Sequence, residues 1–135
     1  MHSEHGGDEP VSSAVNMVGT AVMDAAFAVH RNLGPGLLES VYEHCLAEEL
    51  LQAGLQVERQ VPIPIAYRGS RLDVGFRLDL RVEGKVVVEV KSIDALASIH
   101  KAQVLTYLRF SQIRLGYLIN FNIVRLKDGF HRLVL

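Results

Sequence analysis

The sequence predicts an α/β domain whose elements follow the order α-α-β-β-β-α-β-β. Up to residue 53, apolar residues recur at intervals of three and four, which is the period of amphipathic helices. From Gln56 onward the chain is rich in residues that favour β-strands, with turn residues between the runs. Leu115 to Asn120 is nearly all apolar and follows a third helical segment, which suits a buried strand.

Two helices are expected before Gly54, which is a typical helix stop. The first begins at Ser12 or Ser13, whose hydroxyl suits an N-cap, and runs to about Asn32. The second spans roughly Leu37 to Ala53, after the break at residues 33–36. The residues expected to face the core are Val15, Val18, Val22, Ala25, Ala26 and Val29 in the first helix, and Leu38, Val41, Tyr42, Cys45, Leu46 and Leu50 in the second.

The strand region is expected to begin with an edge strand from Gln56 to Tyr67, because Pro62 and Pro64 lack the N–H groups of a central strand. A turn at residues 68–70 follows. The later expected elements are a hairpin of Phe76–Val82 and Val86–Lys91 around Glu83-Gly84, a helix at Ile99–Phe110, the strand Leu115–Asn120, and a final hairpin within Val124–Leu135 turned at Lys127-Asp128-Gly129.

Length and composition limit the class of protein. With 135 residues, 49% of them hydrophobic and 21% charged, the chain is predicted to form one globular domain at residues 11–135 after a mobile tail at residues 1–10. No apolar run approaches the ~20 residues that span a bilayer, and the first ten residues do not resemble a signal peptide. We therefore expect a cytoplasmic protein without a membrane partner. The single cysteine, Cys45, is expected to be a buried, inert thiol.

Charge is distributed unevenly although the net charge is only −1. Residues 1–58 contain nine acids and one basic residue, Arg31, whereas residues 100–135 contain six basic residues and one acid, Asp128. This asymmetry is compatible with a basic surface for nucleic acid and equally with ordinary solvation of helix and strand faces.

Three polar residues interrupt the most apolar strands. Asp79 lies in the first strand of the central hairpin, and Glu89 and Lys91 lie on one face of the second. Two carboxylates with a nearby lysine suit metal-dependent phosphodiester hydrolysis, although alternating charges on a half-solvated sheet also produce this pattern. A two-residue loop would point Asp79 away from Glu89, whereas a three-residue loop with a left-handed Gly84 would place all three side chains on one face. The active-site hypothesis therefore predicts a bulged hairpin.

Other polar residues share helix faces. Gln103 and Tyr107 are four residues apart in the third helix, with His100 one turn earlier, and Glu39 and Tyr42 are neighbours in the second. For Glu39, an acid in the first helical turn is the ordinary alternative, and for His100 a surface or capping role is favoured. Helix packing is a near-equal alternative for Tyr107.

The segment Gly36-Leu37-Leu38-Glu39-Ser40-Val41-Tyr42 resembles the signature of the GxxExxY family, a branch of the PD-(D/E)xK nuclease-like superfamily. The similarity extends from about residue 14 to the end of the chain. Its other matching segments are residues 30–36, Asp79-Leu80, residues 88–91, residues 100–103, Tyr107-Leu108 and residues 118–121.

The resemblance implies a restriction-endonuclease-like mixed sheet flanked by helices and a site for Mg²⁺ or Mn²⁺. It implies that Asp79 and Glu89 bind the metal and that Lys91 is the catalytic lysine. Glu39 matches an acid from the preceding helix that would serve the metal or the reaction, and Gln103 and Tyr107 match a glutamine–tyrosine motif.

The function expected from these observations is Mg²⁺-dependent hydrolysis of nucleic acid, with DNA or RNA as the partner. Two alternatives remain open at this point. The fold can serve a non-catalytic module that binds nucleotides or nucleic acid or assembles into a homo-oligomer, and the substrate can be a smaller phosphate ester.

Overall fold

The computed structural model describes residues 10–135, so the tail expected at residues 1–10 lies almost wholly outside the described residues. A five-stranded sheet has the order β1-β2-β3-β4-β5. The β3–β4 pair is parallel and the other pairs are antiparallel, which confirms a mixed sheet. The elements are α1 Ser13–Leu33, α2 Glu39–Gln52, β1 Val57–Tyr67, β2 Ser70–Val82, β3 Val86–Lys91, α3 Ser98–Ser111, β4 Leu115–Asn120, the 3₁₀ turn η2 Leu126–Asp128 and β5 Phe130–Val134.

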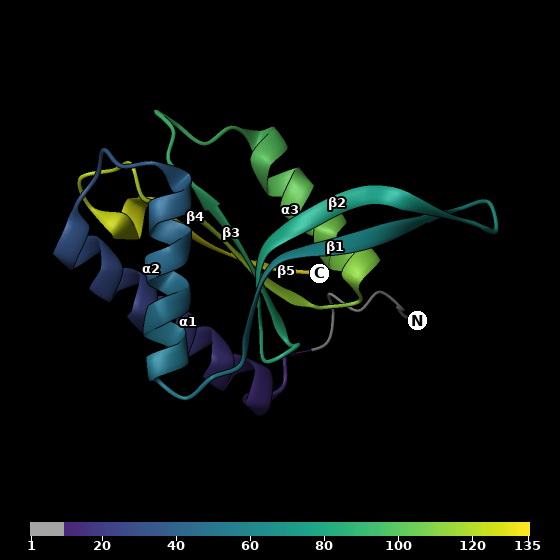
Figure 1. Cartoon of the computed structure of the whole chain (residues 1–135), viewed down its shortest axis with the longest axis horizontal. Coiled ribbons are helices and arrows are strands. Elements are labelled where there is room, and N and C mark those ends of the chain that lie inside the picture. Colours follow the sequence, from purple (N-terminus) through teal and green to yellow (C-terminus); the bar gives the residue numbers. More distant parts are fainter. Residues whose placement is uncertain (1–9) are drawn as a thin grey trace.

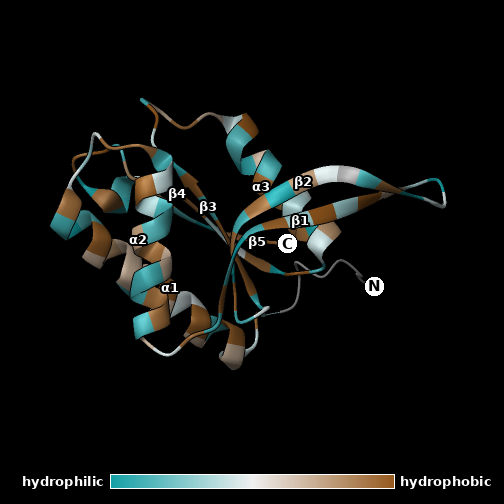
Figure 2. Ribbon diagram, viewed as in Figure 1, coloured by the Kyte–Doolittle hydropathy of each residue, from teal (hydrophilic) through white to brown (hydrophobic). Residues whose placement is uncertain are grey.

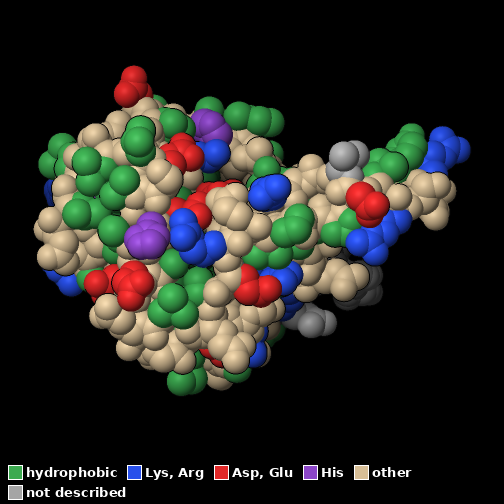
Figure 3. All heavy atoms as spheres, in the orientation of Figure 1, with side chains coloured by type: hydrophobic (Ala, Val, Ile, Leu, Met, Phe, Trp, Pro, Cys, Tyr) green, Lys and Arg blue, Asp and Glu red, His purple; other side chains and the backbone are tan. Residues whose placement is uncertain are grey.

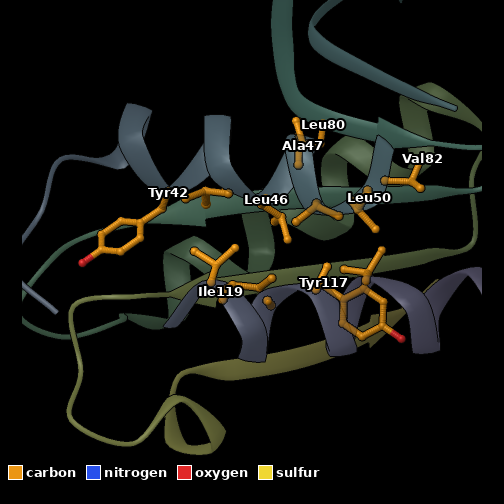
Figure 4. Packing of buried hydrophobic residues seen from close by; sticks show 14 of the residues in the cluster. Tyr42, Leu46, Ala47, Leu50, Leu80, Val82, Tyr117 and Ile119 are labelled. Carbon is orange, nitrogen blue, oxygen red and sulfur yellow. The ribbon is translucent and has the colours of Figure 1, made fainter. Parts of the chain in front are cut away.

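Helices cover both faces of the sheet (Figure 1). Alternate residues of β3 point in opposite directions, so that Val88 packs with α1 and α2 while Val87 packs with α3. Figure 4 shows the first of these layers, in which Leu46 and Leu50 of α2 face Ile119 and neighbouring strand residues. Every residue of β4 is buried, as the apolar sequence of that strand predicts. Figure 2 shows the same arrangement, with hydrophobic central strands and hydrophilic outer helix surfaces.

Tyr42 fixes the start of α2 and therefore the position of the acids that α2 carries. Its ring is fully buried and stacked on Phe121 at a centroid distance of 4.7 Å. Its hydroxyl donates to the Gly34 carbonyl oxygen (2.6 Å) and accepts from the Leu37 amide (3.1 Å). These bonds satisfy one carbonyl and one amide of the turn between α1 and α2.

β1 and β2 continue well beyond the sheet as a long hairpin (Figure 1). β3 pairs only with Leu80–Val82 of β2, whereas β1 pairs with β2 along nearly all its length. We call residues 62–77 the arm. The arm is irregular between Ile63 and Ile65, and a Cβ on Gly75 would collide there with the Ile63 carbonyl oxygen. Close approach of the two backbones therefore requires glycine at residue 75.

The edge position of β1, expected from Pro62 and Pro64, is confirmed. Three other expectations are wrong. The final hairpin within residues 124–135 does not form: η2 lies there, and β5 pairs with β4 instead. The second strand begins at Ser70 instead of Phe76, which makes the arm longer than expected.

The third incorrect expectation concerns the core side of α2. Leu38 is 74% exposed because it precedes the first helical turn, and Val41 is also exposed. Cys45 is only partly buried, and it packs against the core without entering it. Within residues 10–135, no helix is both long and apolar enough to cross a membrane.

Candidate functional site

The β2–β3 hairpin has the bulged connection that the active-site hypothesis predicts. Val82 pairs with Val86 and Leu80 with Val88, so three residues connect the strands. Glu83 and Gly84 have positive φ angles of 54° and 63°, and the Lys85 amide donates to the Val82 carbonyl oxygen (2.9 Å), so a left-handed turn at Glu83-Gly84 is followed by Lys85 as the extra residue. The register places Asp79 across from Glu89 on the same face of the sheet.

Where β2 leaves β3, the two carboxylates accept hydrogen bonds from backbone amides, as carbonyl oxygens do in a regular strand pair. The Asp79 amide donates to Glu89 Oε2 (3.0 Å), and the Val90 amide donates to Asp79 Oδ2 (2.8 Å). The second oxygen of Asp79 accepts a long bond of 3.4 Å from Gln60. Within residues 10–135, Glu89 Oε1 accepts no hydrogen bond. Each acid is thus held in place by one oxygen and retains the other as a ligand or acceptor.

A third acid, Glu43 of α2, lies close to this pair and is buried, with only 6% of the residue exposed. Gln60 donates to Glu43 Oε1 (2.7 Å), and Arg59 forms an ion pair with Oε2 (3.1 Å). Gln60 therefore links Glu43 to Asp79, and its φ of 52° marks an irregularity in β1 opposite Asp79.

Burial and mutual repulsion shape the charge of these acids. Burial, followed by the negative charge of Asp79, raises the pKa of Glu89 from 4.5 to about 8. Burial also raises the pKa of Asp79, and Glu43 adds to that effect, while the Val90 amide, Gln60 and Lys91 oppose it. The site therefore holds more carboxylate than its surroundings can neutralise, which is the electrostatic condition for binding a cation.

Lys91 lies two residues after Glu89 and is partly exposed at the end of β3. Its backbone carbonyl accepts from the Phe121 amide (2.9 Å), so the strand is anchored while the side chain is not. Within the described chain, the Lys91 ammonium group makes no hydrogen bond or ion pair. Its positive charge nevertheless lowers the pKa of both Asp79 and Glu89, so it lies within electrostatic reach of the pair.

Glu39, the first residue of α2, lies near Ser92, which directly follows β3 and is three residues beyond Glu89. Its Oε2 accepts from the Ser92 amide (3.4 Å), and the Ser92 hydroxyl donates to the Leu37 carbonyl oxygen (2.5 Å). These bonds join the start of α2 to the end of β3. The side chain of Glu39 is therefore placed at the edge of the site, beyond Lys91.

The two α3 residues differ in position. Tyr107 stacks on Phe76 of the arm with a centroid distance of 4.1 Å, and its pKa is raised by burial and then by Glu89 and Asp79. Gln103 is exposed one turn earlier. His100 accepts from the Ala97 amide (2.8 Å) at the start of α3, so the expectation that it caps the helix is confirmed.

Comparison with known protein families matches residues 16–133 to the PD-(D/E)XK nuclease superfamily. The chain belongs to this superfamily. The match includes every candidate residue from Glu39 to Tyr107 and confirms the restriction-endonuclease-like class of fold. No match was found among curated proteins or solved structures. Assignment to the GxxExxY branch stays a prediction.

Nucleases of the PD-(D/E)XK superfamily commonly use divalent metals. Asp79 and Glu89 fit such an ion because they supply adjacent hard oxygen ligands in a buried site with surplus negative charge. Among residues 10–135, no group of three or more acids, histidines or cysteines is gathered closely enough to hold a metal. The structure thus brings Asp79 and Glu89 together as a pair and does not add Glu39 to that pair.

Glu43, Arg59 and Gln60 were missed by the sequence analysis. One signal was present, because Glu43 follows Glu39 by four residues and so lies on the same side of α2. That spacing does not distinguish a buried acid from a solvated one. Only the tertiary contacts of Arg59 and Gln60 show that Glu43 belongs to the site.

Proposed function

We propose that this PD-(D/E)XK superfamily member is a Mg²⁺-dependent nuclease that hydrolyses phosphodiester bonds of DNA or RNA. The observation that supports this function best is the interlocked pair of Asp79 and Glu89, with Lys91 two residues along the same strand. A scaffold that only had to fold would gain more from apolar residues here, because buried like charges are costly.

Asp79 and Glu89 would hold the divalent ion through the oxygens that the backbone amides leave available. When bound, this ion supplies Lewis-acid polarisation of the phosphate and lowers the pKa of the attacking water. Lys91 would hydrogen-bond the nucleophile or stabilise the charge that develops on the phosphate oxygens. Its unpaired ammonium group within the described chain is ready for that contact.

Four further residues would support this centre. Glu43, held by Arg59 and Gln60, adds negative charge behind Asp79 and so favours the cation. Tyr107, braced by Phe76, would orient the substrate from the α3 side of the site. We propose that Gln103 contacts the substrate backbone from the exposed face of α3, and that Glu39 orients a water molecule or a second ion from the end of β3.

The test is cleavage of labelled single- and double-stranded DNA and RNA in Mg²⁺ or Mn²⁺. The comparison is among wild type, Lys91→Ala and Lys101→Ala, an exposed lysine of α3 that serves as the matched control. Wild type and the control should cleave at least one substrate, and Lys91→Ala should lose at least 100-fold in rate, because it removes the group that stabilises the developing charge. Equal rates for Lys91→Ala and wild type would remove Lys91 from the mechanism.

Calorimetry tests the metal site without depending on catalysis. Asp79→Asn should weaken Mn²⁺ binding at least tenfold, whereas Glu49→Gln, at an exposed helix position, should not change it. Metal binding that is lost in Asp79→Asn, together with no cleavage of any nucleic acid or of bis(p-nitrophenyl) phosphate, would contradict the nuclease proposal and favour a binding module.

A further inference from the structure

We propose that the arm, residues 62–77, is a nucleic-acid-binding element that contacts the sugar–phosphate backbone of the substrate at a distance from the cleaved bond. This inference rests on the proposed function, because it extends the substrate contact of the same site. It concerns residues that neither the superfamily match nor the site geometry assigns.

The charge of the arm differs from that of the whole chain. The chain has a net charge of −1, yet the arm contains three arginines, Arg68, Arg71 and Arg77, and one acid, Asp73. All three arginines are exposed. Arg71 pairs with Asp73 at 3.3 Å, but both side chains are largely exposed, at 73% and 89%. Such a pair contributes little stability and leaves the guanidinium group accessible to a phosphate.

Strand pairing places two of these arginines on one side of the arm. Arg71 lies opposite Ala66 and Arg77 lies opposite Pro62. The alternate face carries the apolar residues Leu72 and Phe76, and Phe76 is the residue that stacks on α3. Because opposed residues of an antiparallel pair share a face, Arg71 and Arg77 point away from α3.

The base of the arm adjoins the candidate site. Asp79 follows Arg77 by two residues of β2, about 7 Å along an extended strand, and β2 turns between them, because Leu78 packs in the cluster of α3 whereas Leu80 packs in the cluster of α1 and α2. Figure 3 shows basic side chains along the projecting arm on the same face of the molecule as the acidic side chains near its base. A polyanion that is bound at the acids can therefore continue along the arm.

The reach of the arm indicates a polymer as the ligand. Arg71 pairs with Ala66, and Asp79 lies opposite Gln60, so the distance between the two ends corresponds to six residues of β1, at most about 20 Å at ~3.3 Å per residue. Phosphates of one strand of duplex DNA rise by about 3.4 Å per nucleotide, so the arm covers roughly six nucleotides. A mononucleotide or a simple phosphate ester cannot contact both ends. At the tip, Tyr67 is 60% exposed next to Arg68 and offers a ring for stacking on an unpaired base.

The arm is poorly suited to pairing with a strand from another protein chain. β1 forms the outer edge, and Pro62 and Pro64 remove two N–H donors from it. The base of the arm is anchored, because Val61 and Ile63 pack in the same cluster as Val104 and Leu108 of α3. The structure therefore presents a supported basic hairpin with an edge that resists sheet extension.

The test measures binding by fluorescence anisotropy in EDTA, where a Mg²⁺-dependent enzyme cannot turn over. The probes are a labelled 30-nucleotide single strand, a 30-base-pair duplex and a four-nucleotide strand. The arm variant carries Arg68→Ala, Arg71→Ala and Arg77→Ala. The matched control carries Arg31→Ala, Arg125→Ala and Lys127→Ala, three exposed basic residues. They belong to the C-terminal end of α1 and to the η2 segment, which lie at the opposite end of the molecule from the arm (Figure 1).

We expect the arm variant to bind at least one 30-residue probe tenfold or more weakly than wild type does. The slope of log K against log salt concentration should become shallower by about 2 to 3, since each lost phosphate contact contributes ~0.7 to 0.9. The control should stay within about twofold, and Asp73→Asn should bind more tightly because Arg71 loses its competing acid. Loss confined to the single strand, the duplex or both supports the proposal and identifies the form of the ligand.

Equal binding of wild type and the arm variant to both long probes would overturn the proposal, as would an equal loss in the control. Equal thermal midpoints for the arm variant and wild type verify that the fold is intact. The experiments distinguish failure of the proposal that the arm binds nucleic acid from failure of the proposal that the protein is a nuclease. Weaker binding by the arm variant without any cleavage by wild type would defeat only the hydrolysis, whereas Lys91-dependent cleavage with unchanged binding would defeat only the arm.

Discussion

Glu89→Gln tests the electrostatics of the site through the stability of the fold. In the folded protein the pKa of Glu89 is raised to about 8 by burial and by Asp79, whereas the unfolded chain returns to about 4.5. Between these values the folded state retains a proton that the unfolded state has released. The free energy of unfolding of wild type in EDTA should therefore fall as pH rises from about 5 to 9.

The magnitude follows from the size of the pKa difference. At about 1.4 kcal/mol for each pH unit, the decline attributable to Glu89 is at most about 5 kcal/mol, and coupling to Asp79 makes a few kcal/mol the realistic figure. Glutamine keeps an oxygen that can accept from the Asp79 amide and has no ionisable proton. Glu89→Gln should therefore show a much flatter pH dependence and exceed wild type in stability at pH 9.

The assay is urea unfolding followed by circular dichroism at several pH values for wild type, Glu89→Gln and Glu49→Gln. The exposed Glu49 serves as the control, and its variant should keep the slope of wild type. Added Mg²⁺ should remove most of the decline in wild type, because a bound cation stabilises the ionised pair, and should have little effect on Glu89→Gln. Parallel curves for wild type and Glu89→Gln would refute the argument that Glu89 is protonated in the folded state.

Three further substitutions test individual contacts by urea unfolding. Gly75→Ala should cost about 2 kcal/mol, because its Cβ collides with the Ile63 carbonyl oxygen, and unchanged stability would show that the arm can bend away. Tyr42→Phe should cost about 1–2 kcal/mol through the loss of its two backbone hydrogen bonds, and a smaller cost would mean that water replaces the hydroxyl. Arg59→Ala should cost about 1–2 kcal/mol by leaving the buried Glu43 without its cation; adding Glu43→Gln should recover part of this loss, and purely additive effects would contradict their coupling.

The sequence was most informative where local geometry decides the outcome. The N-cap at Ser12 and the edge position of β1 follow from short-range rules of backbone conformation, whereas those rules left the loop length at Glu83-Gly84 open. The loop length determines whether Asp79 faces Glu89, and the three-residue length that the active-site hypothesis requires is the one observed.

Features that depend on tertiary contacts were beyond the sequence analysis. The strand partner of residues 130–134 is β4, and a short turn signal at residues 127–129 does not reveal that choice. The burial of Glu43 depends on Arg59 and Gln60, which come from an edge strand that is distant in sequence. The exposure of Leu38 depends on where α2 begins, and helix starts are hard to place within a residue or two.

At the junction of β2 and β3, carboxylate oxygens accept the hydrogen bonds that carbonyl oxygens accept in a regular strand pair. This arrangement has an evolutionary consequence. Asp79 and Glu89 each accept from an amide of the opposite strand, so selection for a folded sheet would preserve a hydrogen-bond acceptor at both positions without requiring its charge. A related chain without hydrolytic activity would therefore still be expected to carry an acid or an amide at each of these positions. The ammonium group of Lys91 makes no such structural bond within residues 10–135, so the fate of Lys91 is the better indicator, among related chains, of which ones still perform chemistry.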